Sequence, residues 1–127
     1  MNKNIHTGAR LILGLVFVIF GLNGFLHFMP NPTPTAEAGA LFVAFGKTGY
    51  FFPMIKSIEV LVGGMFLTNL FAPLAAVIIT PVLVGITTIH LFLNPSSIPL
   101  MIILHVLHGI IVFGYKKNYQ GLLVKKV

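Results

Sequence analysis

The sequence predicts an all-α membrane protein, a bundle of four transmembrane helices with a short external amphipathic helix between the first and the second. Of 127 residues, 57% are hydrophobic, and the mean hydropathy is +1.00. Glu37 and Glu59 are the only acids, so the chain lacks the charged surface that a soluble domain needs. Long apolar runs separated by short proline- and asparagine-containing breaks complete the pattern. We expect a single domain over residues 1–127.

The first span is expected at residues 11–29, which carry no charge and are followed by a proline-rich segment at 30–34. A proline ring removes a backbone donor and stops a helix. Lys3 and Arg10 precede this run as they would in a secretory signal peptide. The run is longer than a usual signal-peptide core, however, so we expect a retained span.

The remaining spans follow from length. Residues 60–93 carry no charge, and as one helix they would extend about 50 Å, well beyond a hydrocarbon core of about 30 Å. The asparagine and proline in residues 68–73 favour a turn there. The expected elements are therefore a second span at 50–69, a third at 73–93 that is kinked but not ended by Pro81, a turn at 94–97, and a fourth span at 98–115.

The basic residues indicate how the chain is oriented. Of eight Lys and Arg, six flank the apolar runs at the two termini: Lys3, Arg10, Lys116, Lys117, Lys125 and Lys126. The first connection carries only Lys47, so both termini are expected in the cytoplasm, with the chain in the inner or plasma membrane. This placement is an orientation signal, and no nucleic-acid partner is expected. Without cysteine, the chain has no disulfide, thiolate ligand or thiol relay.

The external connection is expected to hold a short helix. Thr33 or Thr35 can cap it, and Glu37 lies favourably near its positive end. Its apolar residues recur at helical spacing: Ala38, Leu41, Phe42 and Phe45. We interpret this helix as an interfacial anchor, and the alternative is a lid over a substrate site.

Polar residues within the spans are expected to form one cluster. A rise of about 1.5 Å per residue places several of them roughly 7–12 Å below the outer surface. We expect six side chains to face one another inside the bundle: Asn23, His27, Lys56, Glu59, His90 and His105. Lipid offers Glu59 no partner, so it should pair with Lys56 one turn earlier, pair with a histidine, or become protonated. No metal site is expected.

Glycines on the spans predict close packing between helices, since small residues let backbones approach. They are Gly14, Gly21 and Gly24 on the first span, Gly63 and Gly64 on the second, Gly85 on the third and Gly109 on the fourth.

Two motifs carry a resemblance to a known family. They are GLNGFLHFMP at residues 21–30 and GYFFPMIKSIEVLVGG at 49–64, followed by a proline-bearing third span and a short fourth. The chain resembles the DoxX family of small four-helix membrane proteins over nearly its whole length. The most specific matches are Asn23, His27, Lys56 and Glu59. The family is functionally mixed, and its name comes from a subunit of a thiosulfate:quinone oxidoreductase, so the resemblance implies a role in a membrane redox or stress complex.

Two functional hypotheses follow. In the first, the chain is a quinone-linked oxidoreductase subunit with an outer-leaflet pocket and no covalently bound cofactor. Its catalytic residues would be Glu59 and His105, and its quinone-binding residues Asn23, His27, Lys56 and His90. In the second, the cluster is structural and the protein is a scaffold or assembly partner. A third hypothesis, histidine pairs such as His27 and His105 as ligands of a b-type haem, ranks below both. The expected partners are the lipid bilayer, other membrane subunits or a second copy of the chain.

Overall fold

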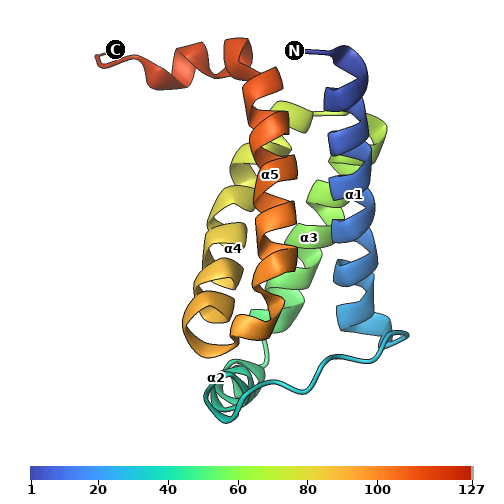
Figure 1. The fold of residues 1–127 in the computed structure, drawn as a ribbon, viewed down its shortest axis with the longest axis vertical. Helices are drawn as coiled ribbons and strands as arrows, with labels where there is room; N and C mark the ends of the chain where they lie inside the picture. The colour runs from blue at the N-terminus through green and yellow to red at the C-terminus, as the bar shows by residue number, and fades with distance from the viewer. Residues whose placement is uncertain (127) are drawn as a thin grey trace.

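The computed structural model describes residues 1–126, all of whose regular elements are helical (Figure 1). Val127, the last residue of the expected domain, lies outside the described residues. In chain order the elements are α1 (Lys3–Leu26), α2 (Ala36–Lys47), α3 (Phe51–Thr68), α4 (Ala72–Leu93), the 3-10 turn η1 (Pro95–Ser97), α5 (Ile98–Gly114) and the 3-10 segment η2 (Lys116–Leu123). Four segments of residues 1–126 are long and apolar enough to cross a membrane: α1, α3, α4 and η1 with α5.

The expected boundaries are confirmed for α3, α4 and α5 to within one residue. The break between α3 and α4 is made by Asn69 and Phe71, which have left-handed φ values of 58° and 53°. The first span differs from the prediction. It begins at Lys3, where the Asn2 side chain accepts a hydrogen bond from the Asn4 backbone N at 2.8 Å, and it ends at Leu26, before the prolines.

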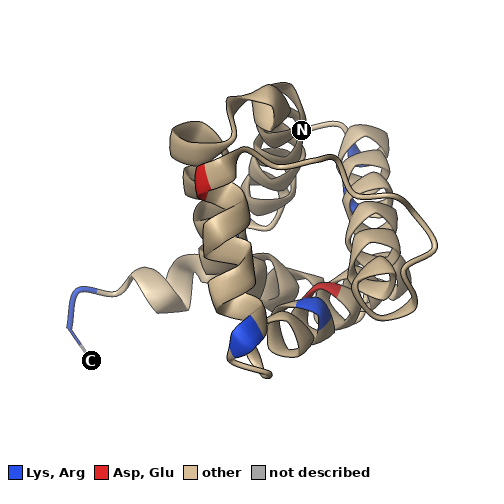
Figure 2. Cartoon of the chain, turned by 90° about the horizontal axis from the view of Figure 1, so that it is seen from below, with Lys and Arg blue, Asp and Glu red and all other residues tan. Residues whose placement is uncertain are grey.

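The four long helices form a closed ring when the bundle is viewed along its axis (Figure 2). α1 lies against α3 and α5, and α4 lies against the same two helices. Both termini lie at one end of the bundle, here called the terminal end, and α2 crosses the opposite end, here called the α2 end (Figure 1). The α1–α3 seam and the α4–α5 seam therefore lie on opposite sides of the ring.

The core is apolar, and so is much of the surface. Phe66, Leu13, Ile79 and Ile111, one from each long helix, are fully buried. Large apolar side chains are exposed along the outside of the same helices, for example Ile12, Leu61, Val84 and Ile102. An apolar exterior of this extent is unusual for a soluble monomer and suits contact with lipid.

Glycines bring α1 and α3 together. A Cβ on Gly63 would lie 2.6 Å from Val18 Cγ2 and 2.8 Å from the backbone O of Gly14. Close approach is confirmed for the glycines of this seam: Gly14, Gly21, Gly24 and Gly63. The packing prediction is wrong for Gly64, Gly85 and Gly109, where a Cβ would have no atom within 4 Å. Their positions face open space, which the sequence alone does not reveal.

Of the two predicted caps, Thr33 and Thr35, it is Thr35 that caps α2: its Oγ1 accepts a hydrogen bond from the Ala38 backbone N at 3.3 Å. The same hydroxyl donates to the backbone O of Leu93 at the end of α4, which ties α2 to the bundle. The predicted apolar face of α2 is confirmed, because its residues are buried or half-buried: Ala38, Leu41, Phe42 and Phe45. Phe45 stacks on Phe51 with ring centroids 3.9 Å apart, so the corner between α2 and α3 is packed by aromatic rings.

α4 continues through Pro81, as predicted. A proline leaves a helix one backbone donor short, and side-chain donors reinforce the turn before it. The Ala76 backbone O accepts from Thr80 Oγ1 at 2.7 Å and from His108 Nε2 at 2.9 Å. His108 thereby joins α5 to α4 at this turn.

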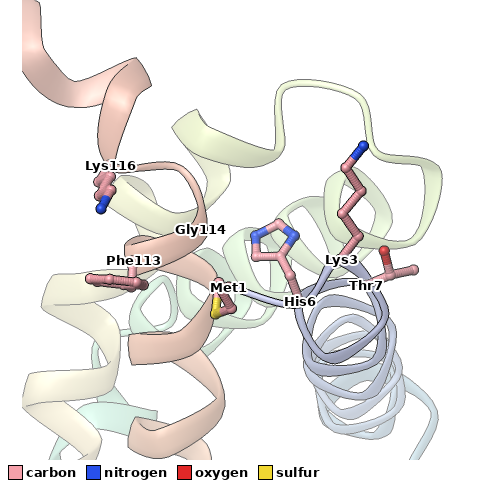
Figure 3. A pocket seen from close by; sticks show the side chains of 7 residues that line it. All are labelled: Met1, Lys3, His6, Thr7, Phe113, Gly114 and Lys116. Atoms are coloured by element: carbon pink, nitrogen blue, oxygen red, sulfur yellow. The ribbon is translucent and has the colours of Figure 1, made fainter.

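The terminal end is closed by contact between the first turns of α1 and the end of α5 (Figure 3). His6 Nε2 donates to the backbone O of Ile111 at 3.3 Å, and the imidazole lies edge-on to the Tyr115 ring with centroids 4.5 Å apart. Gly114 leaves the room for this ring, since a Cβ there would overlap His6.

Candidate functional site

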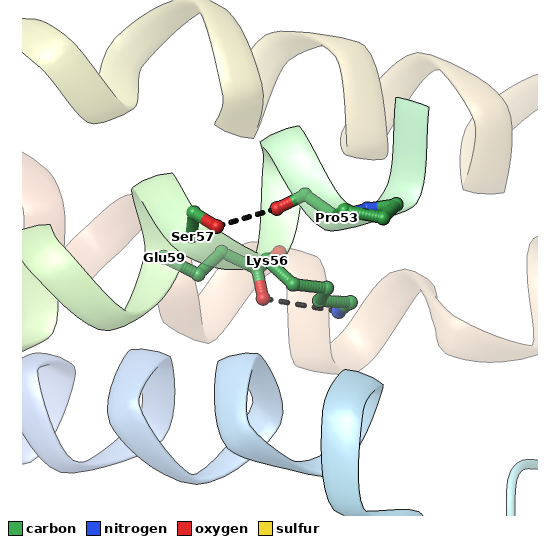
Figure 4. A network of polar contacts seen from close by, with 4 residues as sticks. All are labelled: Pro53, Lys56, Ser57 and Glu59. Carbon is green, nitrogen blue, oxygen red and sulfur yellow. Dashed lines mark hydrogen bonds and ion pairs between the residues drawn. The ribbon is translucent and has the colours of Figure 1, made fainter. Parts of the chain in front are cut away.

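One ion pair lies on the α1–α3 seam. Lys56 Nζ donates to Glu59 Oε2 at 3.0 Å, and within residues 1–126 this is the only ion pair (Figure 4). Glu59 is 3% exposed, whereas the Lys56 side chain is 25% exposed. The predicted pairing of Glu59 with the lysine one turn earlier is confirmed.

Glycines of α1 make room for this pair. A Cβ on Gly24 would lie 2.6 Å from Lys56 Cδ, and one on Gly21 would lie 3.1 Å from Glu59 Cβ. The lysine stem therefore lies along α1 while its ammonium points toward the first turn of α3 (Figure 4). An amphipathic stem of this kind covers apolar surface and carries its charge toward water. Each charge is compensated within the pair, as a structural ion pair requires.

Asn23 and His27 do not form one polar face of α1. Asn23 is buried, but its Oδ1 accepts from the Met29 backbone N at 2.7 Å, and its backbone O accepts from the His27 N at 2.9 Å. His27 lies beyond the end of the helix with a φ of 51° and is exposed. Histidine is among the residue types enriched in this left-handed conformation. The expectation that His27 faces the bundle interior is therefore wrong, and both residues shape the end of α1.

The second polar position is a hydrogen bond between α4 and α5. Thr87 Oγ1 and His105 Nε2 are 2.7 Å apart, and Met101 Sδ lies 3.8 Å from the same hydroxyl. They lie in a groove of about 390 Å³, here called the α4–α5 groove, lined by Thr87, Leu91, Ile98, Met101, Ile102, His105 and Val106. Apart from the hydroxyl and the imidazole, the lining side chains are apolar. Several of them are exposed on the outside of the bundle, so the groove opens on its apolar exterior.

His90 lies on α4 three residues after Thr87 and is half-buried. Its Nδ1 is the one buried side-chain nitrogen or oxygen of residues 1–126 that has no hydrogen-bond partner. Its backbone O accepts from the Asn94 N, which ends the helix. The His90 imidazole therefore has one nitrogen near the α2 end that neither donates nor accepts a hydrogen bond.

The structure does not assemble all six predicted residues. Among residues 1–126, side-chain hydrogen bonds join only one pair of the six, Lys56 with Glu59. Glu59 lies on the α1–α3 seam and is absent from the described lining of the α4–α5 groove, where His105 lies. The geometry therefore presents two polar positions on opposite sides of the ring.

Polar residues near the terminal end were not singled out by sequence. Arg10 is 8% exposed, and its Nη1 donates to the Phe66 backbone O near the end of α3, where a cation is favourable. The Tyr115 hydroxyl donates to Asn69 Oδ1 at 2.9 Å. Burial raises the pKa of Tyr115, and the charge of Arg10 partly offsets that rise, so the phenol stays a donor at neutral pH. An arginine beside an apolar run is read from sequence as a flanking charge, and only helix packing shows that it is buried.

No family model, curated protein or solved structure matches this chain. Within residues 1–126 no three His, Asp or Glu side chains are grouped so that they could hold a metal ion. Fold and polar positions together define a four-helix bundle with helices of membrane-spanning length, a closed ion pair on one seam and an apolar groove with one imidazole on the other.

Proposed function

We propose that this protein is a DoxX-like, multi-pass protein of the inner or plasma membrane and serves as a quinone-binding subunit of a membrane oxidoreductase. The apolar exterior and the four long helices support the membrane assignment. Both termini lie at the end that carries most of the basic residues, which supports a cytoplasmic location for them. The resemblance to the DoxX family rests on the sequence motifs at residues 21–30 and 49–64.

The observation that carries the proposal is the Thr87–His105 hydrogen bond in the α4–α5 groove. A quinone has a flat ring, carbonyl oxygens that accept hydrogen bonds, and an apolar tail. Ligand sites of this kind are mostly apolar with a few placed polar groups. If Thr87 donates to Nε2 of a neutral His105, the imidazole proton is on Nδ1, which gives the ligand one N–H donor. The tail would leave through the exposed apolar lining into lipid.

His105 is the proton-exchanging group in this proposal. Reduction of a quinone to a quinol takes up two electrons and two protons, so a partner redox subunit would supply the electrons while His105 passes protons to the ring oxygens. An imidazole suits this role because one ring nitrogen can accept a proton while the other carries one. Glu59, the second catalytic candidate from the sequence, pairs with Lys56 on the other seam, and we assign that pair to holding α1 and α3 together.

Adjacent threonines give a matched test. Thr87 bonds His105, whereas the hydroxyl of Thr88 bonds only the Gly85 backbone O within its own helix. Binding of a short-tailed quinone to the purified protein is measured by equilibrium dialysis. Thr87→Val should weaken binding about tenfold, the loss expected for one net hydrogen bond, and His105→Leu should weaken it further. Thr88→Val should change it less than twofold. Equal affinities of Thr87→Val and the wild type would overturn the proposal.

A second candidate function, a membrane scaffold without a ligand, is favoured by one observation. The Lys56–Glu59 pair is compensated internally on a seam packed through glycines, as a purely structural element would be. A scaffold would lose its partner when the bundle is destabilised and would be indifferent to the groove. Copurification of the same membrane partner with wild type and His105→Leu, together with no quinone binding by either, would favour the scaffold.

A further inference from the structure

A pocket at the terminal end, away from both positions above, lies between the first turns of α1 and the end of α5 (Figure 3). Its volume is about 290 Å³. The polar side chains in its lining are Lys3, His6, Thr7 and Lys116. These polar side chains are two lysines, one imidazole and one hydroxyl, and no carboxylate is among them.

Two of these side chains are held in place. Lys116 Nζ lies 4.5 Å from the centroid of the Phe113 ring, a cation–π contact that keeps the ammonium beside the pocket. His6 is fixed by its bond to the Ile111 backbone O and by its edge contact with Tyr115. Lys3 lines the pocket from the first turn of α1, on the side opposite Lys116, and its extended side chain points away from His6 (Figure 3). The pocket thus lies between two lysines that come from different helices.

The positive charge of this pocket has no counter-charge in the described chain. Glu59 is paired with Lys56, and Glu37 lies in the first turn of α2, which crosses the opposite end of the bundle (Figure 1). Residues 1–126 contain no other acidic side chain. An anion that neutralises Lys3 and Lys116 must therefore come from outside these residues.

We propose that this pocket binds the phosphate of an anionic phospholipid headgroup. Lysine and threonine side chains are suitable phosphate donors, and basic pockets between membrane helices bind anionic headgroups. Phe113, which lines the pocket, is 55% exposed, so apolar surface is available for the acyl chains. The bound lipid would hold α1 against α5 at the terminal end, where most of the basic residues lie. This inference is independent of the quinone proposal.

The test compares lipids and matched lysine variants of the full chain in detergent. Native mass spectrometry measures binding of phosphatidylglycerol, of phosphatidylcholine with the same acyl chains, and of inorganic phosphate. The pocket variant is Lys3→Gln with Lys116→Gln. The control variant is Lys117→Gln with Lys125→Gln, which removes the same charge from exposed positions outside the pocket lining. These side chains are exposed, so melting temperatures should match the wild type.

Phosphatidylglycerol should bind the wild type more tightly than either other probe. The pocket variant should lose about fivefold per lysine, roughly 25-fold in total, and the control variant no more than twofold. Equal losses in both variants would overturn the proposal by showing a diffuse attraction to charge. Equal binding of phosphatidylcholine would also overturn it. Phosphate bound as tightly as phosphatidylglycerol, with the same loss in the pocket variant, would assign the site to a free anion and refute the lipid.

Discussion

Gly63→Ala should loosen the bundle, because α1 and α3 meet through their backbones at this position. The added Cβ would lie 2.6 Å from Val18 Cγ2, 2.7 Å from the Val18 backbone N and 2.8 Å from the Gly14 backbone O. Two of these three atoms belong to the backbone and cannot rotate away. Non-bonded carbon contacts are comfortable at about 3.5 Å, so the two helices must separate locally by several tenths of an ångström.

The neighbouring glycine isolates this effect. Alanine is a better helix former than glycine by about 1 kcal/mol, and this gain offsets part of the clash in Gly63→Ala. Gly64→Ala receives the same gain with no clash, because its Cβ would meet nothing within 4 Å. The difference between the two variants therefore equals the overpacking term, about 1–3 kcal/mol.

Thermal unfolding in detergent, followed by circular dichroism at a helical band, measures this difference. Gly63→Ala should melt roughly 4–12 °C below Gly64→Ala, and Gly63→Leu should melt lower still. Gly64→Ala should melt at or above the wild-type temperature. Coincident melting curves for the two alanine variants would refute the close approach of α1 to α3 at Gly63.

Further variants test the polar contacts and the orientation. Glu59→Gln should lower the free energy of unfolding by about 1–3 kcal/mol, since it leaves the Lys56 ammonium unpaired though able to reach toward the α2 end. Adding Lys56→Met should restore most of this loss. If Glu59→Gln alone were as stable as the wild type, the ion pair would not stabilise the bundle. Arg10→Met should cost about 1.5–3 kcal/mol in the same assay, the range for a hydrogen bond from a charged group, and an unchanged melting curve would show that the guanidinium does not hold the end of α3. A reporter fused after Lys126 should be cytoplasmic, and a tag near Thr35 should be accessible only from outside. Labelling of that tag only from the cytoplasm would show that the chain has the opposite orientation.

Much of the fold could be predicted because the relevant information is local. Charge-free stretches set the spans, Asn69 and Pro73 mark the break between α3 and α4, and Thr35 starts α2 with its hydroxyl. The Lys56–Glu59 pair was also predictable, since residues three apart on a helix are neighbours and neither charge has another partner in lipid.

What could not be predicted depends on which helices become neighbours and on how each is rotated. The sequence places Glu59 and His105 at similar depths below the outer surface. The arrangement of the four helices in a ring puts them on opposite seams. The sequence gives no signal for Thr87, since threonine is common in membrane helices, and its contact with His105 forms only when α4 lies beside α5. His27 shows the other limit. Its left-handed backbone ends α1 before the prolines, a local choice that spacing along an assumed helix cannot reveal.

The proposed quinone site is tested most directly by finding where a photoreactive quinone analogue attaches. The analogue is bound to the purified protein, illuminated, and its position is read from peptides by mass spectrometry, with excess unlabelled quinone as the competition control. Competable labelling is expected on both walls of the α4–α5 groove, at residues 87–91 and 98–106. Competable labelling confined to α1 and α3 beside Glu59 would contradict it and would return the quinone to the Lys56–Glu59 seam.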